Sequence, residues 1–358
     1  MSNDRADAGA KHLTHVLSCP VSFRTRAQRQ VAVKTASCVH PQPAVEPATC
    51  RRVGLGLHAR LGFSSRLPID RVRERRYGST MVRFALSTAQ HKTTWDRLDA
   101  CWQVADGLDV FESGWLFDHF YPLFVEPTQP CLEGWTALAM LLARTKRIRG
   151  GLLVSAVSYR HPAVLANMVA TIDIASAGRL ELGLGAGWFV EECEAYGLQL
   201  GTLKQRFDRF DEALDVIESL LTQEKTTFSG EYYQLKEALL VPKPVQQPRP
   251  PLCIGGQGER RTLLAVARHA DHWNAPALDA ETFQRKLAVL HQHCADIGRD
   301  PSTITVSNLI RYDGTDTILA QVDTFQALGV DLFIVGVPYP HDPDDIGRLG
   351  ELLGTVTG

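Results

Sequence analysis

Short apolar segments alternate with helical segments from residue 82 to the end of the chain. Eight segments are short and apolar enough to be strands, and polar or helical stretches separate them. They are residues 82–86, 109–117, 148–155, 179–185, 251–256, 271–275, 304–310 and 330–337. This order predicts repeated βα units and a parallel sheet.

Two of the intervening segments show a clear helical stripe. Apolar residues at steps of three and four lie on one face of a helix and predict that this face is buried. The first stripe is Leu165, Met168, Ile172 and Ala175, and the second is Phe207, Phe210, Leu214, Ile217 and Leu221.

Eight such strands within residues 81–358 fit an α/β fold, the TIM (β/α)8 barrel, whose active sites lie at the carboxyl ends of the strands. An open doubly wound sheet stays an alternative, because one sequence does not reveal strand order. Residues 222–251 are too long for a tight connection. We expect a small hairpin within residues 226–235, beside the barrel mouth.

Residues 1–80 differ in composition from the rest. They carry 14 basic and five acidic side chains, whereas the remainder carries 24 and 35. They show no sustained apolar periodicity, so we expect a disordered basic extension. An organellar transit peptide or a nucleic-acid arm is the alternative, and Met81 could be the natural start. No aromatic interleaving accompanies the basic residues, so we expect no nucleic-acid partner.

The cysteines and the apolar runs indicate the cellular compartment in which the protein is expected. Eight cysteines are scattered without C-x-x-C spacing, which argues against a metal site or a disulfide framework. No apolar run is long enough to span a bilayer, and no secretory signal is evident. We expect a cytoplasmic protein with no membrane partner.

The stretch "GRLELGLGAGWFVEE", residues 178–192, runs from an apolar strand into a glycine-rich turn. A dinucleotide-binding turn has the pattern G-x-G-x-x-G and opens a helix. Here the pattern is G-x-G-x-G, and no acidic residue closes a second strand at the expected distance. The stretch therefore does not predict a dinucleotide site.

Five blocks carry a family resemblance: "FESGWLFDHF", "GGLLVSAVSYRHPAVLANMVATIDIASAGRLELGLGAGW", "FSGEYYQL", "PPLCIGG" and "ADHWN". Their order and spacing resemble the bacterial luciferase-like monooxygenases, and more nearly their F420-dependent oxidoreductase branch. The resemblance spans residues 81–353. It implies a luciferase-like TIM barrel that binds coenzyme F420, or alternatively FMN, at the strand ends and transfers a hydride.

The resemblance places catalytic groups at the end of the second strand. Asp118 and His119 match the Asp-His pair that faces the cofactor ring in this branch. Histidine suits proton transfer because its ordinary pKa lies near neutrality. A core histidine is the structural alternative. Asp118 would orient His119 or bond the cofactor.

The resemblance also implies a cofactor seat. A cis peptide bond is expected at Leu153–Val154, in the third-strand segment, and an anion-binding loop before a helix in "CIGGQGERR". The cofactor-binding candidates are Leu153, Val154, Ser155, Gly185, Gly187, Trp188, Gly255, Gly256, Gly258 and Trp273.

The residue type at Trp188 differs from that of some F420-dependent enzymes in this branch. Some sugar-phosphate dehydrogenases carry a glutamate at this turn, whereas an indole cannot transfer a proton. Glu191 and Glu192 follow within one turn, and the sequence does not show whether their carboxylates extend into the site. This puts a sugar-phosphate substrate in doubt.

The sequence thus predicts an F420-dependent oxidoreductase acting on a small organic molecule. The alternatives are an FMN-dependent monooxygenase of the same fold and a non-catalytic cofactor-binding protein. Whether two copies form a homodimer stays open.

Overall fold

The structure is a computed structural model that describes residues 82–276, 278–312 and 315–357. Our expectations for residues 1–80 and for a start at Met81 lie outside these residues. The described part of the chain contains all eight predicted strands.

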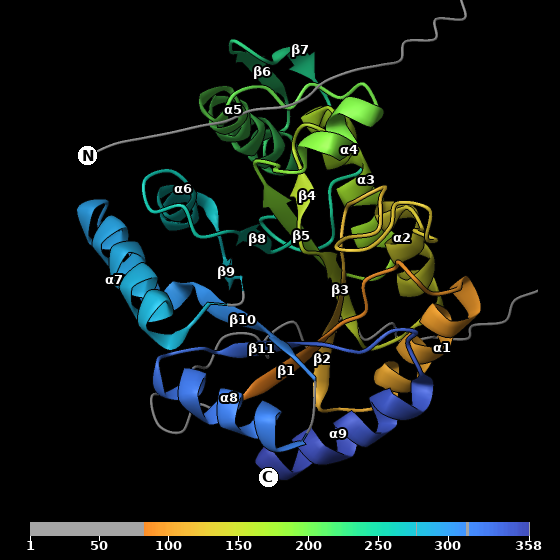
Figure 1. Cartoon of the computed structure of the whole chain (residues 1–358). Helices are drawn as coiled ribbons and strands as arrows, with labels where there is room; N and C mark the ends of the chain where they lie inside the picture. The colour runs from red at the N-terminus through yellow and green to blue at the C-terminus, as the bar shows by residue number, and fades with distance from the viewer. Residues whose placement is uncertain (1–81, 277, 313–314, 358) are drawn as a thin grey trace, which may run out of the picture. The chain divides into compact units, whose positions relative to one another are not determined.

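Eight parallel strands form a closed barrel, in the order β1, β2, β3, β5, β8, β9, β10 and β11 (Figure 1). β11 pairs with β1, and β3 pairs with β5, so the sheet has no free edge. This confirms the TIM barrel and excludes the open sheet. The strands are β1 (Arg83–Ser87), β2 (Phe111–Leu116), β3 (Arg149–Leu152), β5 (Leu180–Gly185), β8 (Leu252–Gly255), β9 (His272–Ala275), β10 (Thr305–Arg311) and β11 (Leu332–Gly336), with the two-residue β4 (Ser155–Ala156) beside β5.

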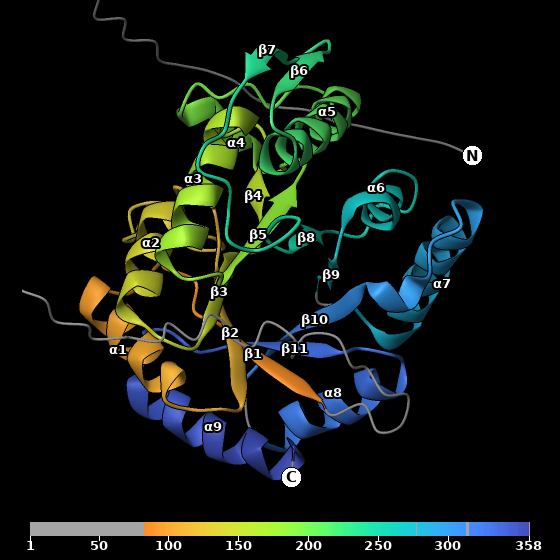
Figure 2. The same cartoon turned by 180° about the vertical axis from the view of Figure 1, so that it is seen from behind.

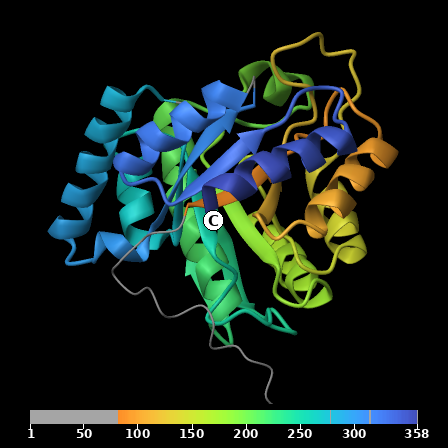
Figure 3. The same cartoon turned by 90° about the horizontal axis from the view of Figure 1, so that it is seen from below.

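Helices surround the strands in both side views (Figures 1 and 2). They are α1 (Trp95–Asp106), α2 (Gly134–Arg144), α3 (Pro162–Ala175), α4 (Val190–Ala195), α5 (Leu203–Thr222), α6 (Thr262–His269), α7 (Ala280–Asp296), α8 (Thr315–Ala327) and α9 (Pro343–Thr357). α9 packs beside α1, which joins the two ends of the barrel domain (Figure 3). Within the described ranges, no helix is long and apolar enough to cross a membrane.

The predicted stripe on α5 is largely confirmed. Phe210, Leu214, Ile217 and Leu221 are buried, and Phe207 packs against the core while remaining half-buried. The helix begins at a capping box in which the Thr202 and Gln205 side chains each accept from the other's backbone N–H.

The predicted stripe on α3 needs one correction. Leu165 and Ile172 are buried and Met168 is half-buried, but Ala175 is exposed. The inner face carries Asp173 instead, whose carboxylate accepts hydrogen bonds from the backbone N–H groups of residues 245 and 246. The buried face of α3 thus includes a hydrogen-bonded aspartate, which a pattern of apolar residues cannot predict.

The predicted hairpin is confirmed by the antiparallel strands β6 (Thr226–Ser229) and β7 (Gln234–Ala238), which lie beside α5 in Figures 1 and 2. The Glu212 carboxylate of α5 accepts from the backbone N–H groups of residues 231–233 in the turn. The Tyr233 hydroxyl donates to the Val157 carbonyl, 3.5 Å away, just after β4. The turn therefore reaches the carboxyl end of the barrel.

The amino-terminal end of the barrel interior is polar. Glu181, near the start of β5, accepts from Arg149 Nε at 2.9 Å and lies 3.7 Å from His272 Nδ1. His272 Nε2 lies 2.6 Å from the Ser307 hydroxyl of β10. We call Glu181, Arg149 and His272 the floor cluster, because all three lie at the starts of their strands.

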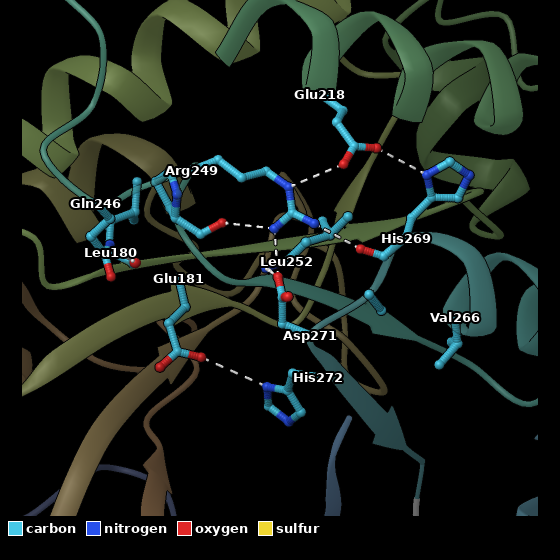
Figure 4. A network of polar contacts seen from close by, with 12 residues as sticks. Leu180, Glu181, Glu218, Gln246, Arg249, Leu252, Val266, His269, Asp271 and His272 are labelled. Carbon is cyan, nitrogen blue, oxygen red and sulfur yellow. Dashed lines mark hydrogen bonds and ion pairs between the residues drawn. The ribbon is translucent and has the colours of Figure 1, made fainter. Parts of the chain in front are cut away.

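Figure 4 shows the floor contact between Glu181 and His272 together with a second network outside it. There the Arg249 guanidinium lies 2.5 Å from the Asp271 carboxylate and donates to the His269 carbonyl at 2.8 Å. Glu218 of α5 contacts both Arg249 and the His269 ring. These contacts tie α5 and α6 to the start of β9.

The floor cluster shifts both of its titrating groups toward their charged forms. Burial raises the pKa of Glu181, but His272 and Arg149 outweigh it and hold the pKa at about 2. Burial lowers the pKa of His272, but Cys253 and Glu181 outweigh it and raise the pKa to about 10. The cluster is therefore an ion pair at neutral pH.

Glu181→Gln should leave the buried His272 and the half-buried Arg149 without their carboxylate and lower the free energy of unfolding by about 3–5 kcal/mol near neutral pH. The Glu181 contribution is full above its ordinary pKa of 4.5 and is lost as pH falls toward 2. The His272 contribution is full below 6.5 and is lost as pH rises through 10. Urea unfolding across pH should show both limbs in the natural chain and a flattened acid limb in the variant.

Glu237→Gln is the matched control, because Glu237 pairs with Lys225 on the surface. Exposed pairs contribute about 0–1 kcal/mol, so this variant should unfold nearly as the natural chain does. Equal losses in the two variants would contradict a stabilising floor cluster.

Candidate active site

Loops that leave neighbouring strands at their carboxyl ends meet in one polar cluster. His119 follows β2, Tyr159 follows β4, and Glu192 lies in the first turn of α4 after β5. His119 Nδ1 lies 2.9 Å from Glu192 Oε2, and the Tyr159 hydroxyl donates to the same carboxylate. Because active sites of this fold lie at this end of the barrel, the cluster is the candidate active site.

Glu192 organises the cluster from a fully buried position. Its carboxylate also accepts from the backbone N–H groups of Phe120 at 2.6 Å and Tyr121 at 2.8 Å. Burial raises the pKa of Glu192, but the hydrogen bonds from His119, Tyr159 and Tyr121 outweigh it and hold the pKa below its ordinary value. Glu192 is therefore a carboxylate at neutral pH.

This carboxylate selects the tautomer of His119. An ionised carboxylate only accepts hydrogen bonds, so Nδ1 carries the proton that faces Glu192. The hydrogen bonds that described residues make to the His119 side chain all involve Nδ1. Nε2 is then the nitrogen that can exchange a proton with a bound molecule, and an imidazolium would be stabilised by the charge of Glu192.

Asp118 contacts Arg160 rather than His119, and its predicted contact with the cofactor stays a prediction. It is buried, and its carboxylate is held by Arg160 through bonds of 2.5 and 3.0 Å, while Arg160 also contacts Glu133 at 2.6 Å. Burial raises the pKa of Asp118, and Arg160 opposes this shift. Glu192, rather than Asp118, therefore orients His119, and Asp118 fixes the backbone segment that carries His119.

The expected cis peptide bond at Leu153–Val154 is present. The Val154 side chain lies between two glycines: a Cβ on Gly185 would lie 2.7 Å from Val154 Cγ2, and one on Gly255 would lie 3.0 Å from Val154 Cγ1. Real Cβ atoms essentially never approach other atoms to 2.7 Å. Glycine at Gly185 therefore makes room for Val154 at the mouth of the barrel.

The glycine-rich loop before α6 has the features of an anion site. Gly256 has φ +121°, which side-chain-bearing residues rarely adopt, and a Cβ on Gly258 would lie 2.9 Å from Thr262 Oγ1. Arg261, the residue before α6, provides no side-chain cap for the first-turn N–H groups. The Leu263 N–H already donates to the Gly258 carbonyl at 3.0 Å, so the other N–H groups of this turn are the ones that can bind an anionic group of a ligand.

Three of the predicted cofactor-binding residues contact the protein around the barrel mouth. Trp273 is fully buried and donates from Nε1 to the Gly256 carbonyl at 2.9 Å, so it holds the anion loop from behind and does not line the mouth. Ser155 is also fully buried, where its hydroxyl accepts from Trp135 Nε1 at 2.8 Å. Gly187, with φ +86°, forms the turn that leads to α4.

Trp188 faces the mouth. Its side chain is 53% exposed, and its ring lies edge-on to His119 with centroids 5.5 Å apart. An indole at this position adds an apolar surface beside the His119 imidazole. Among the described residues, no cluster of histidine, cysteine, aspartate and glutamate side chains could hold a metal ion.

The fold places the chain in the class of (β/α)8 barrels, with the His119–Glu192 cluster at the carboxyl ends of the strands. Residues 79–312 match the luciferase-like monooxygenase family. The chain belongs to this family.

Two relatives show the range within the family. The chain is 30% identical over 249 residues to F420-dependent glucose-6-phosphate dehydrogenase of Microbacterium testaceum (strain StLB037), covering 68% of this chain and 72% of the relative. It is 33% identical over 224 residues to F420-dependent hydroxymycolic acid dehydrogenase of Mycobacterium tuberculosis (strain ATCC 25618 / H37Rv), covering 62% of this chain and 60% of the relative.

Solved structures agree on the fold. An F420-dependent secondary alcohol dehydrogenase in complex with an F420-acetone adduct has a TM-score of 0.70 at 19% identity, covering 77% of this chain and 99% of that chain. The monooxygenase RslO1 from Streptomyces bottropensis has a TM-score of 0.65 at 18% identity, covering 77% and 100%.

Gly185→Ala should force Val154 out of its place, because the new methyl group would lie 2.7 Å from Val154 Cγ2. We expect a lower melting temperature and weaker cofactor binding, with a loss of about 1–3 kcal/mol typical of overpacking. Thermal unfolding and cofactor titration measure the two effects.

Gly347→Ala in α9 is the control, since its Cβ would meet nothing within 4 Å. Alanine is favoured over glycine inside helices by about 0.8–1.0 kcal/mol, so this variant should be neutral or slightly more stable. Unchanged stability and cofactor binding in Gly185→Ala would contradict the conclusion that Gly185 makes room for Val154 at the cofactor site.

Proposed function

We propose that this chain is an F420-dependent oxidoreductase that transfers a hydride between coenzyme F420 and a small organic substrate, while His119 exchanges the accompanying proton. The observation that carries the assignment to His119 is its 2.9 Å contact with the buried Glu192 carboxylate at the barrel mouth. The dehydrogenase relatives, which use F420, support the choice of cofactor.

The residues present fit such a cofactor. Gly256, Gly258 and the uncapped first turn of α6 would hold its phosphate, and Leu153 and Val154 would lie behind its ring. F420 supplies hydride acceptance and donation at a deazaflavin ring, with a carbon in place of the flavin N5.

His119 performs the part of the reaction that belongs to the chain. Nε2 accepts a proton when the substrate is oxidised and returns one when it is reduced, and Glu192 stabilises the charged intermediate state of the ring. Asp118 and Arg160 keep the segment in place.

Two alternative functions differ from this one in properties that can be measured. An FMN-dependent monooxygenase of the same fold would react with oxygen through reduced flavin, and a non-catalytic protein would bind cofactor without turnover. We expect the protein to act in the cytoplasm, without nucleic-acid partners. A homodimer stays a prediction.

F420 should bind with higher affinity than FMN. The purified protein titrated with each oxidised cofactor, followed by cofactor fluorescence, gives both dissociation constants under the same conditions. Tight FMN binding without detectable F420 binding would identify the chain as the flavin-dependent monooxygenase.

His119→Ala should slow the chemical step by about 10²–10⁴-fold, the usual contribution of general acid–base catalysis, with little change in cofactor affinity. Single-turnover oxidation of bound reduced F420 by surrogate carbonyl acceptors measures this step. His291→Ala, at an exposed position of α7, is the control and should react at the natural rate. A folded His119→Ala protein with an unchanged rate across several acceptors would remove His119 from the mechanism.

Glu192→Gln should slow the same step by about tenfold, because a charge-assisted hydrogen bond to His119 becomes a neutral one and about 1.4 kcal/mol is lost. Glu192→Asp keeps the charge and should restore part of the natural rate. An unchanged rate in a folded Glu192→Gln protein, or no recovery in Glu192→Asp, would contradict this role for Glu192.

A further inference from the structure

A second histidine lies at the carboxyl end of the barrel. His91 follows β1 and is 5% exposed, and its Nδ1 accepts a hydrogen bond from the Leu123 N–H at 3.2 Å. A ring nitrogen that accepts carries no proton, so in the neutral ring Nε2 carries it and is a donor. Burial and the neighbouring His341 lower the pKa of His91 to about 4, so the ring is neutral at pH 7. Within the described part of the chain, Nε2 has no hydrogen-bond partner.

Further hydrogen-bond donors lie around Tyr339, next to His91. The His91 and Tyr339 rings meet edge-on with centroids 4.5 Å apart, and Lys92 Nζ lies 5.3 Å from the centre of the Tyr339 ring. Arg311 ends β10, and its charge opposes the burial that raises the pKa of Tyr339. We call His91, Lys92, Arg311 and Tyr339 the donor cluster.

The cations of the donor cluster are available to a ligand. Among the described residues, no carboxylate forms an ion pair with Lys92 or Arg311, and the Lys92 ammonium lies over the Tyr339 ring instead. Lys92 is half-buried and has φ +52°, a conformation that residues with a side chain seldom adopt and that is concentrated at ligand sites. A half-buried ammonium beside neutral N–H and O–H donors is suited to an anionic oxygen group.

The donor cluster lies across the barrel mouth from the loop before α6. In the closed order of strands, β1 and β8 are separated by three strands in either direction. The donor cluster follows β1, β10 and β11, whereas the glycine-rich loop that would hold the cofactor phosphate follows β8. The two places that suit an anion are therefore on opposite sides, and the donor cluster is free to bind the substrate.

One aromatic ring separates the donor cluster from His119. The Phe117 ring is edge-on to both histidines, with centroids 5.1 Å from His91 and 5.4 Å from His119. A substrate that contacts His119 can therefore extend past Phe117 and reach His91 with its far end.

We propose that the donor cluster binds a carboxylate of the substrate, held away from the carbon that exchanges the hydride. This inference rests on the proposed function. Lys92 supplies the positive charge, while His91 Nε2 and the Tyr339 hydroxyl supply neutral donors. A carboxylate carries one negative charge and matches the one half-buried cation of the cluster, since Arg311 is exposed. A phosphate ester carries about −1.5 to −2 at pH 7 and matches it less well.

Arg206 offers a competing place for an anion. Its guanidinium contacts the Gly187 carbonyl at 3.5 Å, beside Trp188, and it lies in the first turn of α5. This position follows β5, so an anion bound there would not depend on Lys92. Variants at the two cations therefore distinguish the two places.

Titration with hexanoate tests the donor cluster without turnover, because this anion has no alcohol or ketone group. Calorimetry on the protein loaded with oxidised F420 should show saturable binding. Lys92→Met should weaken it about tenfold, which corresponds to about 1.4 kcal/mol, through loss of the charge-assisted contact. Hexanamide has nearly the same shape without the charge, so it should bind the natural chain more weakly than hexanoate and bind Lys92→Met as well as the natural chain.

Three further variants locate the binding. His91→Phe keeps a ring and removes the Nε2 donor, so it should weaken hexanoate about fivefold, as expected for a neutral hydrogen bond. Lys146→Met is the matched control, because Lys146 is an exposed lysine before β3, at the amino-terminal end of the barrel. Lys146→Met and Arg206→Met should both bind hexanoate with the natural affinity. Thermal unfolding verifies that each variant is folded.

The outcomes separate the donor cluster from the proposed function. Failure to load F420, seen by its fluorescence before any hexanoate is added, would overturn the proposed function and with it this inference. With F420 bound, no saturable hexanoate binding, an unchanged affinity in Lys92→Met, or a loss in Arg206→Met instead would overturn the inference alone. Tighter binding of hexyl phosphate than of hexanoate would also overturn it, in favour of a phosphate ester.

Discussion

One buried carboxylate holds together the loops on which the site depends. Glu192 accepts hydrogen bonds from His119, from Tyr159 and from the backbone of residues 120 and 121, so it joins the loops after β2 and β4 to α4. A buried carboxylate left without partners costs several kcal/mol. The loops are therefore fixed relative to one another by the requirement to satisfy this single group, and the position of the His119 ring follows from it.

The barrel carries a second histidine–carboxylate pair, and its surroundings differ from those of His119 and Glu192. At the floor, Glu181 is shared between His272 and Arg149, and His272 Nε2 is already taken by Ser307. Both imidazole nitrogens there have partners inside a closed core. At the mouth, the carboxylate occupies Nδ1 of His119, and the hydrogen bonds from described residues leave Nε2 open. The same chemical pair stabilises the fold at one end and is available to a ligand at the other.

Local pattern was sufficient to predict the strands, the closed barrel's fold class and the hairpin, because each depends on apolar runs and turn residues within a short window. It failed where a partner lies far away in sequence. Asp173 turns inward on α3 because residues 245 and 246 need an acceptor, and Glu192 reaches a histidine 73 positions earlier. The acidic residue was visible after the glycine turn, but its reach depends on barrel closure. Trp273 likewise appeared as a ligand candidate, whereas its indole supports the Gly256 loop from the core.

The replacement of an acid by Trp188 changes how the reaction must be divided among the remaining groups. An indole contributes no proton at the mouth, so in the proposed reaction proton transfer falls to His119, whose Nδ1 lies 2.9 Å from Glu192 and 3.3 Å from the Tyr159 hydroxyl. The tryptophan then contributes in another way: it shields the imidazole edge and presents an apolar plane 5.5 Å from it. The mouth of the barrel thus places a histidine with a fixed tautomer beside an apolar plane.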